Sequence, residues 1–443
     1  MFSILNYLDN FFWSYIAFVL ILSCGLYFSF KAKFSQIILL PIFCKSFWNF
    51  SKTKIESSNQ GIHPLKIFFA SAGGTIGIGN VVGVVSAACA GGPGALFWVW
   101  IAGLIGSIVK YSEVYLGIKY RKIHPDGCYS GGPMYFLKQA FNNSFLPFIV
   151  SILLCIYGIE IYQFSIIVNS ITHNWGISRL LVIGILLSTV LYTVIGGLKR
   201  ISKICSILLP IFLCAYFFMG FFILFKEFSN IPALFISVFK SAFTGHAALG
   251  GFAGCTIATT IRHGISRAAY SGDIGIGFDS VIQSESAVKD PSLQASLSIV
   301  GIFIDNFVCT MSILMVLISG SWLSFNHDPS LAIQSALNKY FPYIHLFFPI
   351  FLFLTGYTTI TSYFIVGKKC ASFLFNDIGS KIYIFYGAFS LVFFCFLPQD
   401  NALTVMSISG ALLLIINLLG IFKLKNEIKF PTKNALKINV NNQ

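Results

Sequence analysis

The stretch "SAGGTIGIGN", residues 71–80, lies inside a hydrophobic segment that is long enough to cross a lipid bilayer. Four of its residues are glycine. Because glycine costs a helix about 1 kcal/mol relative to alanine, the stretch predicts a break near the middle of a membrane span. Lipid tolerates irregular backbone only where it is buried in protein or lines a cavity. We therefore expect a binding site here, where one half-helix ends in free carbonyls and the next begins with free amides.

The composition places the whole chain in the membrane class. Of its 443 residues, 56% are hydrophobic and 10% are charged, whereas soluble domains carry about 25% charged residues. A segment of about 20 apolar residues is needed to cross the hydrocarbon core. That criterion predicts eleven spans, near residues 11–30, 66–90, 94–118, 144–173, 180–196, 204–225, 232–256, 294–320, 343–367, 382–397 and 403–422.

The lysines and arginines agree with these spans and give an orientation. With the N-terminus outside, 24 of the 29 lie in predicted cytoplasmic loops or the tail, and only Arg179, Lys226 and Lys339 lie in outside loops. An excess of positive charge in inside loops is typical of membrane proteins. We therefore expect a multi-pass protein of the cell (inner) membrane with a cytoplasmic C-terminus. Topology also explains the net charge of +14, so we expect membrane lipid and no nucleic acid among the partners.

A second glycine-rich stretch, "GHAALGGFAG" at residues 245–254, interrupts the predicted seventh span. Spans two to six and seven to eleven then form two sets of five, each opening with an interrupted helix. Because five is odd, the second set crosses the membrane in the opposite direction. Paired interruptions in corresponding halves point to a transporter binding site. The predicted fold is all-α and polytopic, with about 11 transmembrane helices, a 5+5 inverted repeat and two discontinuous helices.

The loops leave no room for a separate soluble domain, so we expect one transmembrane domain over residues 1–443. We expect an N-terminal span with an amphipathic cytoplasmic linker at 1–65, a first repeat at 66–226, a second repeat at 232–424 and a basic cytoplasmic tail at 425–443. The long connections at 257–293 and 321–342 are expected to be an inside and an outside loop.

The predicted ninth span carries a face of hydroxyl groups. In "LTGYTTITSYF", residues 354–364, Thr355, Thr358, Thr359 and Ser362 follow the i, i+3, i+4, i+7 spacing of one helix face. Such hydroxyls either bond back to carbonyls of their own helix or, beside a broken helix, complete an all-oxygen shell for a small cation such as Na⁺.

The sequence lacks the residues that are characteristic of other classes of protein. The sequence has no HExxH motif, no nucleophile–base pair at mid-depth and no cofactor motif, so we expect neither enzyme activity nor a cofactor. "GIGNVVG" misses the GxGxxG spacing by one residue and follows no strand. The eleven cysteines are scattered and indicate no disulfide framework. A channel is the other alternative, but two inverted halves around a central site favour alternating access.

Long motifs make the chain resemble the alanine/glycine:cation symporter family, also called sodium:alanine symporters. They are "GTIGIGNVVGV" (74–84), "GGPGALFWVWIAGLIGSIVKYSEVYLGIKYR" (91–121), "GGPMYFL" (131–137), "HAALGGFAG" (246–254), "GIFIDNFVCT" (301–310) and "GKKC" (367–370). The resemblance implies a leucine-transporter-like fold and a small amino acid carried with Na⁺. The chain departs from the family at "SGDIGIG" (271–277), where "SNEAGLG" is common, at Tyr363 in place of tryptophan, and at "GIEIYQFS" (158–165) in place of a sequence like "GNMVQANS".

Few ionisable groups lie at membrane depth. Glu113 follows Lys110 by three residues and is expected to pair with it on the helix surface. Asp305 is expected to bond to a neighbouring helix. Glu160 either lines the site or serves as a structural partner, and His246 is either a packing residue or a proton carrier.

We therefore predict a secondary transporter that imports a small neutral amino acid, alanine or glycine, together with Na⁺ as coupling ion; the alternative is coupling to H⁺ through Glu160 or His246. The substrate carboxylate is expected at the amides of 75–79 and its ammonium group at carbonyls near 250–252. No acidic side chain lies at either predicted break, so a charged substrate side chain would find no evident partner there, which favours small neutral amino acids. The expected substrate contacts are Thr75, Gly77, Gly79, Asn80, Glu160, Gln163, Gly250, Gly251, Phe252, Thr359 and Tyr363. The expected Na⁺ ligands are Ala72, Thr75, Thr358, Thr359 and Ser362. The sequence carries no signal of oligomeric state.

Overall fold

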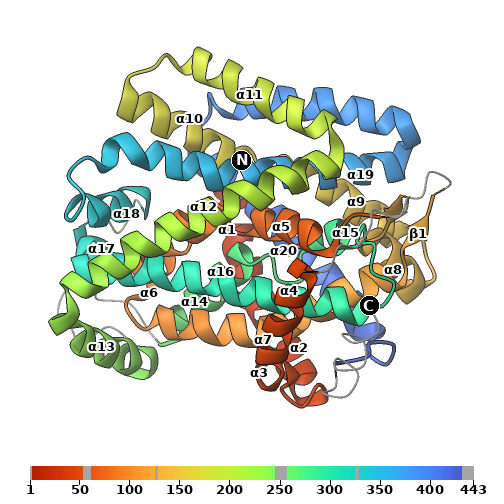
Figure 1. The fold of residues 1–443 in the computed structure, drawn as a ribbon, viewed down its shortest axis with the longest axis horizontal. Helices are drawn as coiled ribbons and strands as arrows, with labels where there is room; N and C mark the ends of the chain where they lie inside the picture. The colour runs from red at the N-terminus through yellow and green to blue at the C-terminus, as the bar shows by residue number, and fades with distance from the viewer. Residues whose placement is uncertain (1, 53–60, 125–127, 245–256, 325–328, 432–443) are drawn as a thin grey trace.

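The computed structural model describes residues 2–52, 61–124, 128–244, 257–324 and 329–431 (Figure 1). Apart from turns and irregular connections, the described residues form helices and a short hairpin of β1 (Lys122–Ile123) paired antiparallel with β2 (Tyr129–Ser130). The expectation of an all-α protein is therefore confirmed. The helices are α1 (Phe2–Phe11), η1 (Phe12–Ala17), α2 (Phe18–Lys31), α3 (Ser35–Ile38), α4 (Leu40–Lys52), α5 (Pro64–Thr75), η2 (Gly79–Gly83), α6 (Val85–Gly91), α7 (Ala95–Lys119), α8 (Pro133–Phe141), α9 (Phe145–Tyr157), α10 (Ile161–Trp175), α11 (Arg179–Ile195), α12 (Gly197–Lys226), η3 (Phe228–Asn230), α13 (Ile231–Thr244), α14 (Ile257–Ser271), α15 (Phe278–Gln283), α16 (Pro291–Ser319), α17 (Ser321–Ser324), α18 (Pro329–Asn338), α19 (Ile344–Phe394) and α20 (Gln399–Lys423).

Some of these helices have the length and composition to cross a membrane. Within the described ranges, seven helical stretches are long and apolar enough, two of which, Ile4–Lys31 and Phe145–Trp175, join neighbouring helices. The pair of α5 with η2–α6 makes an eighth span, bent by 46° at the predicted break. The 51-residue α19 contains a kink with non-helical backbone at Phe375 and Asn376, which divides it into the two predicted spans. The shorter apolar helix α11 has 17 residues.

The described interruption in the second half of the chain lies at residues 272–277, between α14 and α15. This region was expected to lie in a long connection over 257–293, but residues 257–271 of that connection form a helix. Its backbone has positive φ angles at Asp273, Gly275 and Gly277, which end the helix. The predicted interruption at 245–254 lies outside the described residues. The predicted span at 232–256 is replaced, where the structure describes it, by the 14-residue helix α13.

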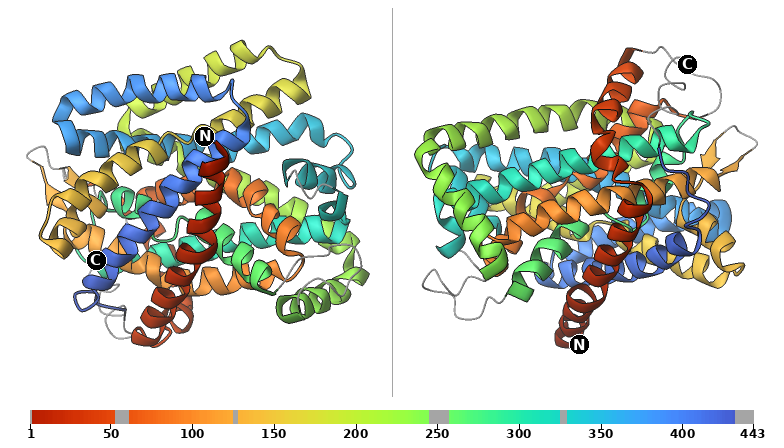
Figure 2. Two further views of the ribbon diagram at one scale, coloured as in Figure 1. Left: turned by 180° about the vertical axis from the view of Figure 1, so that it is seen from behind. Right: turned by 90° about the horizontal axis from the view of Figure 1, so that it is seen from below.

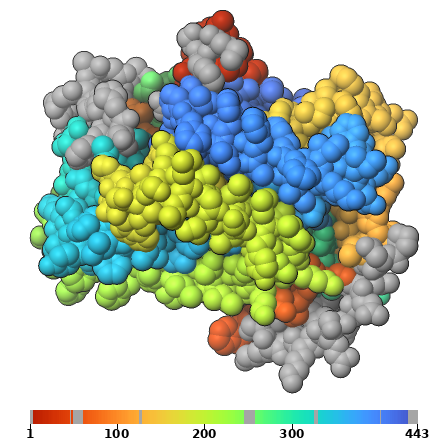
Figure 3. Space-filling model, turned by 90° about the horizontal axis from the view of Figure 1, so that it is seen from above, coloured from red at the N-terminus to blue at the C-terminus, as the bar shows by residue number. Residues whose placement is uncertain are grey.

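The two broken helices pack against each other at the centre of the fold. The half-helix α5 contacts α15, and α6 contacts α14. The two broken helices therefore run in opposite directions, as an inverted repeat requires. Helices α7 and α16 flank this pair. On another side, α19 lies beside α10, α11 and α12 (Figure 3). The N-terminal α1–α2 packs at the edge, along α20 and α7 (Figure 2).

A polar contact joins two helix ends at the surface of the molecule. Lys119 at the end of α7 forms an ion pair with Glu427, with 2.6 Å between Nζ and Oε2, and the Tyr120 hydroxyl donates a hydrogen bond to the same carboxylate. The Lys119 and Tyr120 hydrogen bonds lower the pKa of Glu427 from its ordinary value of 4.5.

Candidate functional site

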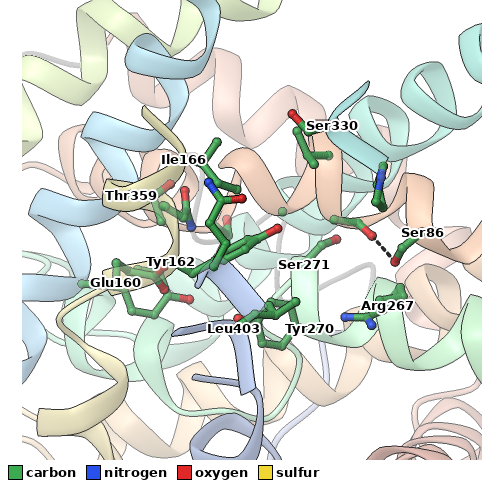
Figure 4. A pocket seen from close by; sticks show the side chains of 18 of the residues that line it. Ser86, Glu160, Tyr162, Ile166, Arg267, Tyr270, Ser271, Ser330, Thr359 and Leu403 are labelled. Carbon is green, nitrogen blue, oxygen red and sulfur yellow. Dashed lines mark hydrogen bonds between the residues drawn. The ribbon is translucent and has the colours of Figure 1, made fainter. Parts of the chain in front are cut away.

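A cavity of about 400 Å³ lies where the broken helices meet α10, α19 and α20 (Figure 4). Six of the predicted substrate contacts line it, namely Thr75, Gly79, Glu160, Gln163, Thr359 and Tyr363. Its size fits the range of about 300–1,000 Å³ that is usual for small-molecule sites. The other described lining residues are Gly74, Val82, Gly83, Ser86, Tyr157, Tyr162, Ile166, Arg267, Tyr270, Ser271, Pro329, Ser330, Gln399 and Leu403.

The first break is held by two side chains, Asn80 from just beyond the break and Gln163 from α10. The Gly77 amide donates to Asn80 Oδ1 at 2.9 Å, and the Ile78 amide donates to Gln163 Oε1 at 3.1 Å. The Ile76 amide bonds to the carbonyl of Ala72. These three amides already have partners in the protein, so they do not form the open cradle that the sequence predicted. The Thr75 side chain and the Gly79 backbone remain at the cavity wall.

Asn80 is buried and connects the break to α16. Its side-chain nitrogen donates to Asp305 Oδ1 at 2.5 Å, and its carbonyl accepts from Ser312 Oγ at 2.6 Å. The expectation that Asp305 bonds to a neighbouring helix is confirmed. Asn80 itself does not line the cavity, so its contribution is to fix the turn at Gly77.

The hydroxyl face of α19 packs against the last turn of α5. Thr359 Oγ1 lies 3.2 Å from the Gly73 carbonyl and 3.1 Å from the Thr355 carbonyl. Thr358 Oγ1 bonds to its own helix, 2.7 Å from the Thr355 carbonyl. Buried Thr355 Oγ1 has no hydrogen-bond partner in the described part of the chain. Hydroxyl and carbonyl oxygens therefore gather at the end of α5.

The remaining predicted Na⁺ ligands lie at the same contact. Thr75 Oγ1 is 3.3 Å from the Ala72 carbonyl. Ser362 Oγ lies 3.7 Å from Cys205 Sγ, and a Cβ built on Gly74 would be 3.2 Å from Ser362 Cβ. Thr75 and Thr359 line the same cavity, whereas Ala72 lines a separate small hollow against α15 and α16. The hydroxyl and carbonyl oxygens of these residues are of the kind that hard cations prefer.

A third irregular segment brings a carboxylate to the cavity. Glu160 lies between α9 and α10 with left-handed backbone (φ 56°, ψ 44°), a conformation that non-glycine residues seldom adopt. Its side chain is hydrogen-bonded to Gln163 and lines the cavity. Since strained backbone concentrates at functional sites, the geometry favours the site-lining interpretation of Glu160.

The second break is anchored by a buried lysine. Lys110 Nζ lies 2.6 Å from Asp279 Oδ2 and 3.4 Å from Asp273 Oδ2, and all three side chains are at most 4% exposed. It also donates to the carbonyls of Gly272 and Asp273 at 2.9 and 2.7 Å. Asp279 and Asp273 lie on either side of 274–277, so one ammonium group holds both ends of the interruption.

This arrangement corrects the expected pairing of Lys110 with Glu113. Glu113 instead accepts a hydrogen bond from the Ser280 amide at 3.3 Å. Tyr363, one of the expected substrate contacts, donates to Asp273 Oδ1 at 2.8 Å, and its ring stacks on Phe278 at 3.8 Å between centroids. It therefore joins the cavity wall to the second break.

The sequence reasoning missed the residues that α14 contributes. Arg267, Tyr270 and Ser271 line the cavity but fall in the stretch expected to be a loop. The cavity therefore contains charged side chains of both signs, of which Glu160 was among the expected contacts and Arg267 was not. The predicted contacts Gly250, Gly251 and Phe252, and His246, lie outside the described residues.

Two antiparallel broken helices around a central cavity, in a bundle of apolar spans, define a multi-pass membrane transporter. The profile of the Sodium:alanine symporter family matches residues 1–438. The chain is 30% identical over 456 residues to the sodium/alanine symporter AgcS of Methanococcus maripaludis, covering 98% of this chain and 99% of that one. It is 27% identical over 434 residues to the probable sodium/glutamine symporter GlnT of Bacillus subtilis, covering 94% and 87%. A crystal structure of a mutant of the Eremococcus coleocola manganese transporter superposes with a TM-score of 0.58 at 14% identity, covering 85% of this chain and 82% of that one.

The chain belongs to the Sodium:alanine symporter family. It is an amino-acid transporter of the multi-pass membrane class and not an enzyme. The expected leucine-transporter-like fold is confirmed.

Proposed function

We propose that the protein imports a small neutral amino acid, alanine or glycine, by symport with Na⁺. The observation that carries this proposal is the contact of Thr359 Oγ1 with the Gly73 carbonyl, because it joins the hydroxyl face of α19 to the end of the broken helix. Na⁺ bound there by Ala72, Thr75, Thr358, Thr359 and Ser362 lies beside the cavity, so that its gradient is coupled to the substrate. No cofactor takes part. The name of the relative AgcS supports Na⁺ and alanine, while that of GlnT extends the substrates of the family to glutamine.

The substrate carboxylate lies at the first break, against Thr75 and Gly79, with the Gln163 amide beside it. Alternating access moves the two repeats about this site. The N-terminus is outside and the C-terminus is in the cytoplasm, as the positive charge of the predicted inside loops indicates.

The test is uptake of radiolabelled alanine and glycine into proteoliposomes, with Na⁺ and H⁺ gradients imposed separately. We expect uptake with the Na⁺ gradient alone. Uptake driven by the H⁺ gradient, with Na⁺ absent, would favour the alternative in which Glu160 carries a proton. Absence of uptake with either gradient for both amino acids would refute the proposed substrates.

A further inference from the structure

The cavity carries one acidic and one basic side chain among its described lining residues, Glu160 and Arg267. They lie on opposite sides of the space (Figure 4), Glu160 near Thr359 and Arg267 near Ser86. The proposed function assigns no partner to either charge. Resting on that function, we propose that Glu160 binds the α-ammonium group of the transported amino acid and that Arg267 excludes amino acids with a cationic side chain.

The first part follows from the burial of an unpaired carboxylate. Glu160 is 4% exposed, and in the described part of the chain no lysine, arginine or histidine pairs with it, since the ion pairs there use other acids. A buried charge is costly unless a counter-charge and hydrogen bonds compensate it. Gln163 gives one hydrogen bond, and an ammonium group in the cavity supplies the positive charge.

The position of Glu160 also suits the chemistry of an α-amino acid bound at the first break. Gln163 bonds both to Glu160 and to the Ile78 amide, so one side chain bridges the carboxylate and the break. Both charged ends of an α-amino acid are attached to one carbon atom and therefore bind at neighbouring groups. The carboxylate at Thr75 and Gly79 and the ammonium at Glu160 meet that requirement.

The second part follows from the charge on the opposite wall. Once Glu160 is neutralised by the α-ammonium group, no further acid lines the described cavity. The guanidinium of Arg267 has no ion-pair partner within 4.0 Å in the described residues, although Asp9 lies near it in an adjoining small cavity. A substrate side chain with a second positive charge would face Arg267, and like charges placed together cost several kcal/mol. A neutral side chain meets no such penalty.

Glu160 is tested by binding of alanine and of propionate, which lacks the amino group, to the purified protein at saturating Na⁺. We expect E160Q to weaken alanine about 10- to 100-fold, as the loss of a charged hydrogen bond implies, and to leave propionate unaffected, so that the alanine-to-propionate affinity ratio falls. E160D, which keeps the charge, should restore part of the ratio. A loss of thermal stability in E160Q with an unchanged ratio would show a structural role and overturn the proposal. A lower Na⁺ affinity with an unchanged ratio would overturn it in favour of an ion site.

Arg267 is tested by competition between lysine and alanine in the same assay. R267Q should raise the affinity of lysine relative to alanine by at least about tenfold, whereas R267K should not. Equal ratios in R267Q and the wild type would refute the exclusion. These binding assays need no ion gradient, so their failure can be distinguished from failure of the proposed function. The proposed function fails if uptake by the wild-type protein does not depend on Na⁺.

Discussion

Gly77 is the residue at which a single added carbon atom should damage both proposed sites. An ideal Cβ at this position would lie 2.5 Å from Thr359 Oγ1 and 2.8 Å from Gln163 Oε1, far inside van der Waals contact. The φ angle of Gly77 is not positive, so alanine is excluded by space and not by backbone conformation. In Gly77→Ala, Thr359 must leave the Gly73 carbonyl, or Gln163 must leave the Ile78 amide, or both.

The expected magnitude follows from these contacts. Overpacking costs about 1–3 kcal/mol, and each displaced hydrogen bond costs about 0.5–1.5 kcal/mol, while replacing glycine returns up to about 1 kcal/mol through the unfolded chain. We expect the free energy of unfolding to fall by about 1–4 kcal/mol. The affinities for Na⁺ and for alanine should each fall at least about tenfold, because about 1.4 kcal/mol corresponds to one factor of ten.

The assay combines thermal unfolding of the purified protein with the Na⁺ dependence of alanine uptake in proteoliposomes. Gly79→Ala is the matched control for stability, because a Cβ there meets only Ser271, at 3.7 Å or more. If Gly77→Ala keeps wild-type stability, Na⁺ dependence and alanine affinity, the reasoning from the close approach is refuted.

Three further changes test other parts of the structure. Thr359→Val should weaken Na⁺ dependence about tenfold. Thr361→Val should not, because among the described residues the Thr361 hydroxyl bonds to carbonyls of its own helix alone; equal effects would refute the ion site. Lys110→Met should lower the free energy of unfolding by about 3–5 kcal/mol, because buried acids lose their counter-charge. Lys119→Met, at the surface, should lower it by less than about 1 kcal/mol. Comparable melting temperatures of the two variants would contradict this expectation. Because the folded-state pKa of Glu427 is lowered, the contribution of this carboxylate to stability is present at neutral pH and is lost as the pH falls below about 4.5. Melting temperatures of Glu427→Gln, measured over a series of pH values, should lack that acid dependence.

The first break and its surroundings could be predicted because their signals are local. Glycine density located the interruption at 71–80, and the spacing of hydroxyls located the face of α19 that meets it. Which amides remain free could not be predicted, because the Ile78 amide is taken by Gln163, 85 residues away in sequence. Likewise, Lys110 was assigned to Glu113 by local spacing, whereas its partners come from a segment more than 160 residues away.

The interruption at 272–277 was not predicted, because α14 is not apolar. Arg262, His263 and Arg267 remove residues 257–271 from any hydropathy criterion, although Arg267 faces a cavity inside the protein. The sequence nevertheless contained a sharper signal than glycine density. "GTIGIG" at 74–79 and "GDIGIG" at 272–277 differ at a single position, and the structure interrupts a helix at each of them.

These two similar hexapeptides have different conformations and contacts in the structure. In the first copy the glycines keep ordinary φ angles and Thr75 stands at the cavity wall, whereas in the second Gly275 and Gly277 have positive φ and Asp273 is held by Lys110. The copies need glycine for different reasons, close approach in one and left-handed backbone in the other. An exchange of Thr75 and Asp273 would put an acid at the cavity wall and leave Lys110 with one carboxylate. The one position at which the copies differ therefore places a hydroxyl group at the cavity wall in the first break and a carboxylate bound by Lys110 in the second.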